Sequence, residues 1–110
     1  TLTKNLPLAS GVGGGSADAA ATLFALSEMW SLPLPDWDAI MTLGADVGVC
    51  MSTDMTRMSG IGETLNLIGP TPPLNMLLAN PGVSLSTPAV FSALPQKTNP
   101  AMRAISRNLR

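Results

Sequence analysis

A glycine-rich segment followed at once by strong helix formers constrains this chain more than any other feature. The five residues 11–15 include four glycines, and residues 17–28 favour a helix. Ser16 between them is a suitable N-cap. A helix start of this kind offers unpaired backbone N–H groups to an anion, and glycine lets phosphate oxygens approach the backbone closely. The pattern therefore predicts either an anion-binding loop or a flexible connection.

Two common phosphate-binding motifs do not match this loop. A Walker loop ends in Gly-Lys-Ser or Gly-Lys-Thr, and the chain has no lysine between Lys4 and Lys97. The dinucleotide-binding motif requires a third glycine where Ser16 stands, and it follows a buried strand, whereas Pro7 lies shortly before Gly11. A phosphate site in this loop is therefore of another type.

Asp46 is a single carboxylate within the otherwise uncharged segment 43–50. A short helix is expected just before it, with Asp36 as N-cap and with Gly44 in the left-handed conformation at its end. Its buried side chains are expected to be Trp37, Ile40 and Met41. A carboxylate among apolar neighbours has either a structural partner or a chemical task. Asp46 is therefore either a cap or turn aspartate or a reacting group.

The segment 75–91 carries a third pattern. Residues 76–79 predict a short apolar strand, and residues 80–82 (Asn-Pro-Gly) predict a turn. Thr87 and Pro88 are typical of an N-cap and the first residue of a helix. Phe91 lies one turn into that helix, where it is either an ordinary core aromatic or part of a site.

Proline and charge divide the chain. Three prolines within residues 70–73 predict a linker between two domains, since proline continues neither a helix nor a central strand. All seven acidic residues lie at or before Glu63, so residues 1–63, with two basic side chains, carry a net charge of −5, and the four basic residues beyond give +4. From Asn99 onward we expect a short amphipathic helix whose arginines form a solvated face.

The composition excludes several function classes. The 110 residues include no histidine and one cysteine, so zinc sites and catalysis by Ser-His-Asp or Cys-His groups are excluded within them. A net charge of −1 argues against nucleic acid as a partner, and no apolar run approaches the ~20 residues needed to span a membrane. One cysteine cannot form an internal disulfide, which predicts a reduced, cytoplasmic protein. Because only 12% of the residues are charged, we expect other protein to cover part of this surface.

Taken together, the order and spacing of these motifs resemble the GHMP small-molecule kinases over nearly the whole chain, to about Leu94. The resemblance rests on the loop from Pro7 to Ala21, on Leu43-Gly-Ala-Asp-Val47, on Gly60-Ile-Gly-Glu63, and on the run from Asn80 to Pro88 with Phe91. It implies an α+β fold with a two-domain architecture, of which this chain is an incomplete part. Residues 1–71 would belong to a ribosomal-protein-S5-domain-2-like ATP-binding domain, and residues 72–110 would begin a C-terminal α/β-plait domain.

The resemblance also implies an activity, which is ATP- and Mg²⁺-dependent phosphorylation of the 2-hydroxyl of a small cytidyl-methylerythritol-type substrate in the non-mevalonate isoprenoid pathway. Asp46 would be the catalytic aspartate that takes the proton from, or polarises, the attacking hydroxyl. Thr87 and Phe91 would line the cytidine side, and Ser16 would lend its hydroxyl to phosphate or Mg²⁺. The ATP-binding residues would be Pro7, Leu8, Ala9, Ser10, Gly11, Val12, Gly13, Gly14, Gly15, Ser16 and Ala17. The alternatives are a GHMP kinase acting on homoserine, mevalonate or a sugar, and a non-catalytic anion- or dinucleotide-binding module.

Two residues depart from the usual pattern of that family. Ala17 stands where a second serine is usual, and Gly48 stands where proline is usual. The catalytic lysine of the family, with the tyrosine and histidine that hold cytidine, belongs to an N-terminal segment, and a second glycine-rich motif belongs near the C-terminus. We therefore expect the chain to be an internal fragment of a longer kinase and to be inactive alone.

Overall fold

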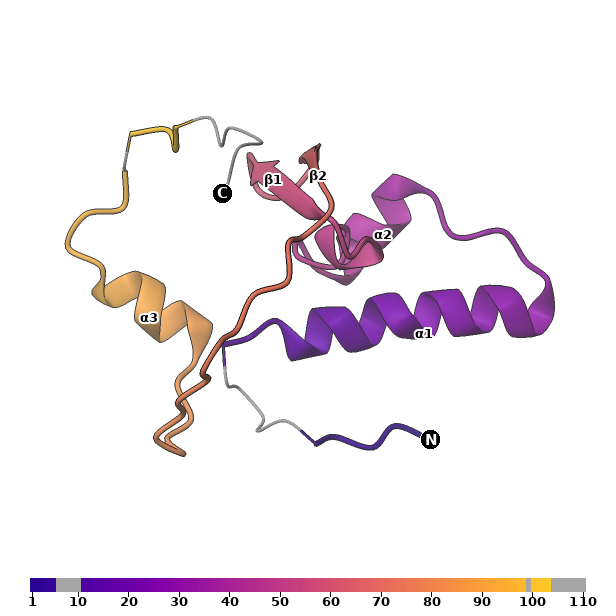
Figure 1. Ribbon diagram of the computed structural model, residues 1–110, viewed down its shortest axis with the longest axis horizontal. Coiled ribbons are helices and arrows are strands. Elements are labelled where there is room, and N and C mark those ends of the chain that lie inside the picture. Colours follow the sequence, from indigo (N-terminus) through magenta and orange to yellow (C-terminus); the bar gives the residue numbers. More distant parts are fainter. Residues whose placement is uncertain (6–10, 99, 104–110) are drawn as a thin grey trace.

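The computed structural model describes residues 1–5, 11–98 and 100–103, and it combines helices with one small antiparallel sheet (Figure 1). In chain order the elements are α1 (Gly14–Trp30), α2 (Trp37–Leu43), the 3-10 turn η1 (Val49–Met51), β1 (Met55–Ser59), β2 (Thr64–Gly69) and α3 (Thr87–Ala93). The α+β class predicted from the sequence is confirmed. Among the described residues, no helix has both the length and the apolar character needed to cross a membrane.

Helix α1 begins earlier than predicted. Gly13 is its N-cap, in the left-handed conformation (φ 70°, ψ 14°) and without a side-chain cap. The prediction that Ser16 caps the helix is wrong, because Ser16 is already the third helical residue. Glycine adopts the left-handed conformation without the steric cost of a Cβ, which allows the helix to start at Gly14.

Helix α2 has the N-cap that was predicted. The Asp36 Oδ1 accepts a hydrogen bond from the Ala39 N–H at 2.9 Å. At the other end, Gly44 has φ 155° and ψ 145°, so the left-handed helical conformation expected there is not formed. Ile40 is buried as expected, but Trp37 remains 36% exposed.

The core of the described chain is small and lies between α1 and the segment 40–51. It consists of the buried side chains Ala20, Ile40 and Val47, with Ala19, Leu23, Cys50 and Met51 packed against them. Alanine on this face of α1 allows η1 to approach the helix closely. Trp30, whose spacing places it on the same helix face as Leu23 and Leu26, is 59% exposed at the end of α1.

Strands β1 and β2 form an antiparallel hairpin, in which Thr56 lies opposite Leu67 and Ser59 lies opposite Thr64. The turn between them contains Gly60 and Gly62, which have φ values of 70° and 116°. The β2 strand extends through residue 69, so the proline-rich segment without helix or strand begins only at residue 70.

The strand predicted over residues 76–79 is not formed. These side chains are exposed, up to 93% at Leu77, and no other strand of the described chain pairs with them. Backbone N–H and C=O groups in a strand need such a partner, so local apolar character alone did not produce one. The turn that follows does occur, and the Asn80 Oδ1 accepts a hydrogen bond from the Gly82 N–H at 2.7 Å.

Helix α3 stands apart from α1 and the hairpin (Figure 1). It starts at Thr87, and its cap is Ser86, whose side chain accepts a hydrogen bond from the Ala89 N–H at 3.3 Å. The predicted cap at Thr87 is therefore wrong by one residue. The difference leaves the Thr87 hydroxyl outside the capping interaction.

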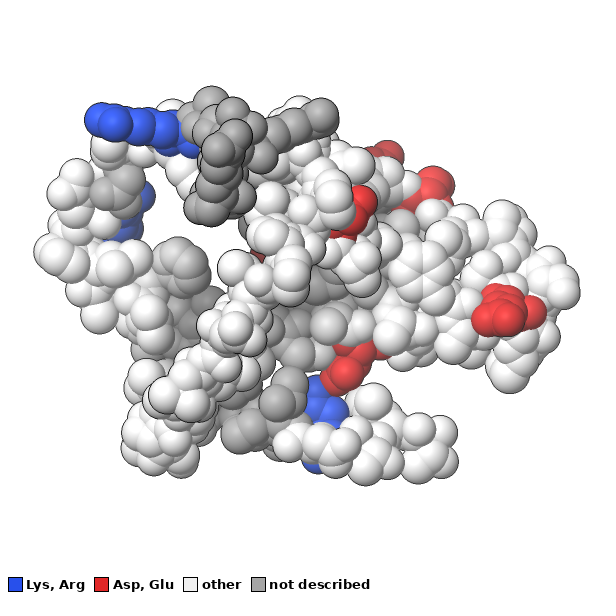
Figure 2. Space-filling model, in the orientation of Figure 1, with Lys and Arg blue, Asp and Glu red and all other residues white. Residues whose placement is uncertain are grey.

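The C-terminal segment is not helical over residues 100–103. The carbonyl of Met102 instead accepts a hydrogen bond from the Arg57 guanidinium at 2.8 Å. The rest of the predicted C-terminal helix, residues 99 and 104–110, lies outside the described residues. On the face shown in Figure 2, acidic side chains lie over the part of the molecule that contains α1 and α2, in line with the uneven charge along the chain.

Candidate functional site

The glycine-rich loop presents backbone amides at the start of α1. The Ala17 N–H donates to the Gly13 carbonyl at 3.0 Å, so the N–H groups of residues 13–16 have no partner within the helix. A Cβ placed at Gly11, Gly13 or Gly15 would meet no heavy atom of the described residues within 4 Å. Within that part of the chain, the backbone at these glycines is uncovered beside the positive end of the helix dipole. Residues 7–10 of the predicted loop, Pro7 to Ser10, lie outside the described residues.

A groove of about 390 Å³ joins this loop to the segment around the start of α3. Its lining includes Gly11 from the loop, together with Asn80, Pro81, Thr87, Val90 and Phe91. The side chain of Phe91 is 62% exposed, so it is not a core aromatic of this chain. The structure thus brings one residue of the predicted loop together with both residues predicted to line a substrate. Ser16 and Asp46 do not line this groove.

The backbone on both sides of Asp46 is tightly packed. On one side, Val47 is 2% exposed and belongs to the core with Ala20. On the other side, a Cβ at Gly62 would lie 2.6 Å from the Ala45 carbonyl oxygen, closer than any side chain can come. Glycine at position 62 therefore lets the hairpin turn rest against the Asp46 segment.

The Asp46 side chain itself is exposed. At caps and turns elsewhere, the side chains of Asp36, Glu63 and Asn80 accept backbone N–H bonds. Within the part of the chain that the structure describes, the Asp46 carboxylate makes no such bond and no ion pair. Its oxygens are therefore open to a ligand from the solvent side.

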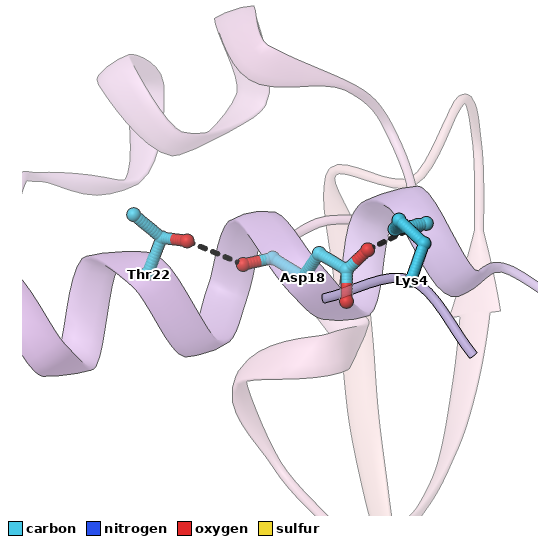
Figure 3. Close-up of polar contacts among 3 residues, drawn as sticks. All are labelled: Lys4, Asp18 and Thr22. Atoms are coloured by element: carbon cyan, nitrogen blue, oxygen red, sulfur yellow. Dashed lines mark hydrogen bonds and ion pairs between the residues drawn. The ribbon is translucent and has the colours of Figure 1, made fainter. Parts of the chain in front are cut away.

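Lys4 forms an ion pair with Asp18 in the second turn of α1 (Figure 3). The two side chains are 32% and 35% exposed and line a hollow of about 210 Å³ together with Gly14. Ion pairs at such exposure contribute up to about 1 kcal/mol. The contact also brings the positive charge of Lys4 to the start of α1. This ion pair could not be predicted from the sequence, because its two residues are 14 positions apart and no local periodicity relates them.

Cys50 lies one turn beyond Asp46, and its N–H donates to the Asp46 carbonyl at 3.4 Å. Burial raises the pKa of the Cys50 thiol above its ordinary value, and the negative charge of Asp46 raises it further. Both causes act against the thiolate, the form that reacts with electrophiles. Both causes therefore favour the neutral thiol of Cys50 over its thiolate.

We expect Asp46→Asn to shift the alkylation of Cys50 by iodoacetamide to lower pH. Removing the carboxylate charge favours the thiolate and so lowers the pKa of Cys50, while burial keeps it above the ordinary value. The rate is measured against pH on the full-length protein by mass spectrometry of the Cys50 peptide. An unchanged midpoint would show that the Asp46 charge does not act on Cys50.

The described residues contain no group of three or more Cys, Asp or Glu side chains arranged to hold a metal ion. The predicted Mg²⁺ contact, Ser16, supplies one hydroxyl in the first turn of α1. Mg²⁺ usually keeps several waters and is bound by substrate phosphates with only one or two protein groups. One hydroxyl fits that kind of site, in which phosphate supplies most of the charge.

Comparisons with known proteins bear on this arrangement. Residues 1–61 match the family described as GHMP kinases N terminal domain. The chain is 59% identical over 103 residues to the 4-diphosphocytidyl-2-C-methyl-D-erythritol kinase of Cereibacter sphaeroides, and 54% identical over 102 residues to that of Ruegeria pomeroyi. Each alignment covers 93% of this chain, and the chain spans 37% of the length of each relative. No solved structure matches it.

The chain combines an α+β fold with a glycine-rich loop that presents backbone N–H groups at the start of its longest helix. Proteins of this class are suited to binding a phosphate group. Within that class the family match decides the assignment. The chain belongs to the GHMP kinase family.

Proposed function

We propose that the full-length protein containing this chain transfers a phosphate group from ATP to the 2-hydroxyl of 4-diphosphocytidyl-2-C-methyl-D-erythritol, in the non-mevalonate route to isoprenoid precursors. Full-length here means the complete translation product that includes these 110 residues. The observation that carries the proposal is the groove lined jointly by Gly11, Thr87 and Phe91. The names of relatives up to 59% identical support the same substrate. A cytoplasmic location stays a prediction.

The proposal assigns ATP to the glycine-rich loop. The N–H groups of residues 13–16 are oriented toward the helix start, where phosphate oxygens can accept them without a Cβ in the way. Mg²⁺ would neutralise charge on the phosphates, with Ser16 as its contact on this chain. In this scheme, residues 1–71 belong to the ATP-binding domain and residues 72–110 begin the second domain.

The cytidyl substrate is assigned to the side of the groove formed by α3. The exposed ring of Phe91 offers a flat apolar face on which a base can stack. Thr87 lies next to it in the lining, and its hydroxyl is not used for capping because Ser86 caps α3. A ring and a hydroxyl that line the groove together with the loop residue Gly11 suit a ligand that extends toward the phosphates.

Asp46 is assigned to the reacting hydroxyl. The hydroxyl oxygen forms a bond to the γ-phosphorus of ATP, the bond from that phosphorus to the leaving ADP oxygen breaks, and the hydroxyl proton passes to the Asp46 carboxylate. Because the transition state of phosphoryl transfer is loose, the main duty of the aspartate is to orient the hydroxyl. Val47 anchors this turn against Ala20, which lies about 9 Å along α1 from Gly14 at 1.5 Å per residue. The turn that carries Asp46 is thus packed on the helix whose start is assigned to the phosphates.

The activity is tested by incubating the full-length protein with ATP and Mg²⁺ and, in separate reactions, with the cytidyl substrate, homoserine, mevalonate or galactose. We expect phosphorylation of the cytidyl substrate alone, measured by mass spectrometry of the products. Transfer to one of the other alcohols would identify a different GHMP kinase. Nucleotide binding without transfer to any of them would identify a non-catalytic module.

We expect Gly15→Ala to stabilise the fold and to weaken ATP binding at the same time. Alanine favours a helix over glycine by up to about 1 kcal/mol, and the added methyl group meets no atom of the described residues. The same methyl group occupies the space assigned to phosphate oxygens, so ATP affinity should fall about tenfold, which corresponds to about 1.4 kcal/mol. Thermal unfolding and calorimetric titration with ATP measure the two effects.

Ala25→Gly is the matched control for this variant. Ala25 is exposed on α1, more than two turns beyond the loop. Glycine there should lower stability and leave ATP affinity unchanged. If Gly15→Ala binds ATP as tightly as the unchanged protein, the phosphates do not lie at this loop.

A further inference from the structure

We infer that Trp37 is a positioning residue for the Asp46 carboxylate and that it acts through contact with Gly48. The inference rests on the proposed function, because it concerns the aspartate assigned there to the reacting hydroxyl. Trp37 is the first residue of α2, and Gly48 is the second residue after Asp46. The contact therefore joins α2 to the turn that carries the carboxylate.

Gly48 is buried directly against the indole ring of Trp37. A Cβ at position 48 would overlap Cη2 of the ring and would lie 3.0 Å from Cζ3 and 3.1 Å from Cζ2. These separations are shorter than the ordinary contact distance of about 3.5–4.0 Å between carbon atoms. The ring thus fills the place that any side chain at position 48 would take.

The backbone does not require glycine at this position. Gly48 has φ −58° and ψ −43°, which lie in the right-handed helical region open to every L-residue. Gly62, by contrast, has φ 116°, a conformation that favours glycine whatever its surroundings. The close approach of the Trp37 ring is therefore the feature that excludes a side chain at position 48.

The turn around Asp46 is held from two sides by these contacts. The ring of Trp37 lies on Gly48, and Gly62 lies against the carbonyl of Ala45. Within the described residues no hydrogen bond fixes the Asp46 carboxylate, so its direction follows from the backbone of the turn. Displacements of about 1 Å in a reacting group can lower a rate by up to ~100-fold. Removing the ring should therefore act on turnover.

The first test compares Trp37→Leu with Trp37→Phe in the full-length protein. We expect Trp37→Leu to lower kcat about 10- to 100-fold while the KM values for ATP and the cytidyl substrate change little, because the binding residues lie elsewhere. Trp37→Phe keeps an aromatic ring but lacks the outer edge of the indole that contacts Gly48, so its kcat should fall less than that of Trp37→Leu. Trp30→Leu is the control, since that exposed tryptophan lies at the far end of α1 from the loop, and kcat should not change.

The second test adds Gly48→Ala to both backgrounds. In the otherwise unchanged protein, the added methyl group displaces the Trp37 ring, and kcat should fall. In the Trp37→Leu background, the same methyl group fills vacated space, and kcat should rise. A variant that only destabilises the fold would lower activity in both backgrounds, so the reversal of sign is specific to the contact between residues 37 and 48.

The outcomes separate this inference from the proposed function. An inactive Asp46→Asn variant together with unchanged kcat in Trp37→Leu overturns the inference and leaves the function in place. A fully active Asp46→Asn variant overturns the role assigned to Asp46, and the inference fails with it. The function itself is overturned only if the unchanged protein does not phosphorylate the cytidyl substrate. If Trp37→Leu does not fold, as judged by circular dichroism, Gly48→Ala alone decides, and an unchanged kcat in that variant overturns the inference.

Discussion

Replacing Asp46 by asparagine in the full-length protein is expected to lower kcat about 10²- to 10⁴-fold, the usual cost of losing one positioned general base. Asparagine has the same shape but cannot accept the hydroxyl proton. Because the amides to which ATP is assigned belong to the start of α1 and not to this turn, ATP affinity should stay within a few-fold. Steady-state kinetics with the cytidyl substrate and calorimetric titration with ATP measure the two quantities.

Asp38→Asn provides the matched control for that experiment. Asp38 is an exposed carboxylate in the first turn of α2, so its loss removes the same charge and about 0.3–1 kcal/mol of favourable interaction with the helix dipole. Its kcat should be unchanged. If Asp46→Asn retains comparable turnover, Asp46 is a structural aspartate and another group serves the hydroxyl.

Local sequence signals predicted the helices of this chain better than their starting points. The prediction of Asp36 as N-cap was correct, because the bond from the backbone N–H three residues later to the aspartate side chain depends only on local sequence. At α1 and α3, the predicted caps were displaced by three residues and by one residue. The structure uses Gly13 in place of Ser16 and Ser86 in place of Thr87. Serine and threonine occur both at caps and in first turns, so residue type alone does not fix the position of the cap.

The strand expected over residues 76–79 failed for a different reason. A strand is stable only when its backbone hydrogen bonds are made by a neighbour, and that neighbour is set by the tertiary fold. Four apolar residues in a row show that burial is favourable, but they do not identify the partner. In the described chain these side chains are exposed, and the segment has no regular structure.

The candidate site was predicted in its parts, but the contacts that support it were not. The loop, Thr87 and Phe91 were identified from the order of motifs, and the structure brings Gly11 to the same groove as the other two. The contacts of Trp37 with Gly48 and of Gly62 with the segment before Asp46 span 11 or more residues. A glycine in a sequence does not show whether a side chain would be tolerated there, and the groups that exclude one at Gly48 and Gly62 become known only from the fold.

The isolated 110-residue chain is expected to be inactive and to lack a cooperatively folded monomeric state. Three apolar side chains are buried in the described residues, while Ile61 is 79% exposed and Leu77 is 93% exposed. The accessible surface is 9229 Å², compared with about 5,700 Å² for a compact protein of this mass. The radius of gyration is 16.1 Å, compared with about 13 Å for a compact domain of 110 residues. So little burial cannot offset the conformational entropy lost on folding.

Exposed apolar surface on this scale favours association, and 12% charged residues with a net charge of −1 provide little repulsion to oppose it. We therefore expect the purified chain to form soluble oligomers or precipitate, to bind a dye that reports apolar surface, and to melt without a sharp transition. Analytical ultracentrifugation and differential scanning calorimetry measure these properties, with the full-length protein as control.

Turnover by the isolated chain should also be absent, because the loop must be ordered on binding and the Asp46 turn is held only by contacts that need a folded core. A monomer with a single cooperative transition would show that α1, α2 and the hairpin are sufficient to fold, and phosphorylation of the cytidyl substrate by that monomer would show that they also hold a complete site.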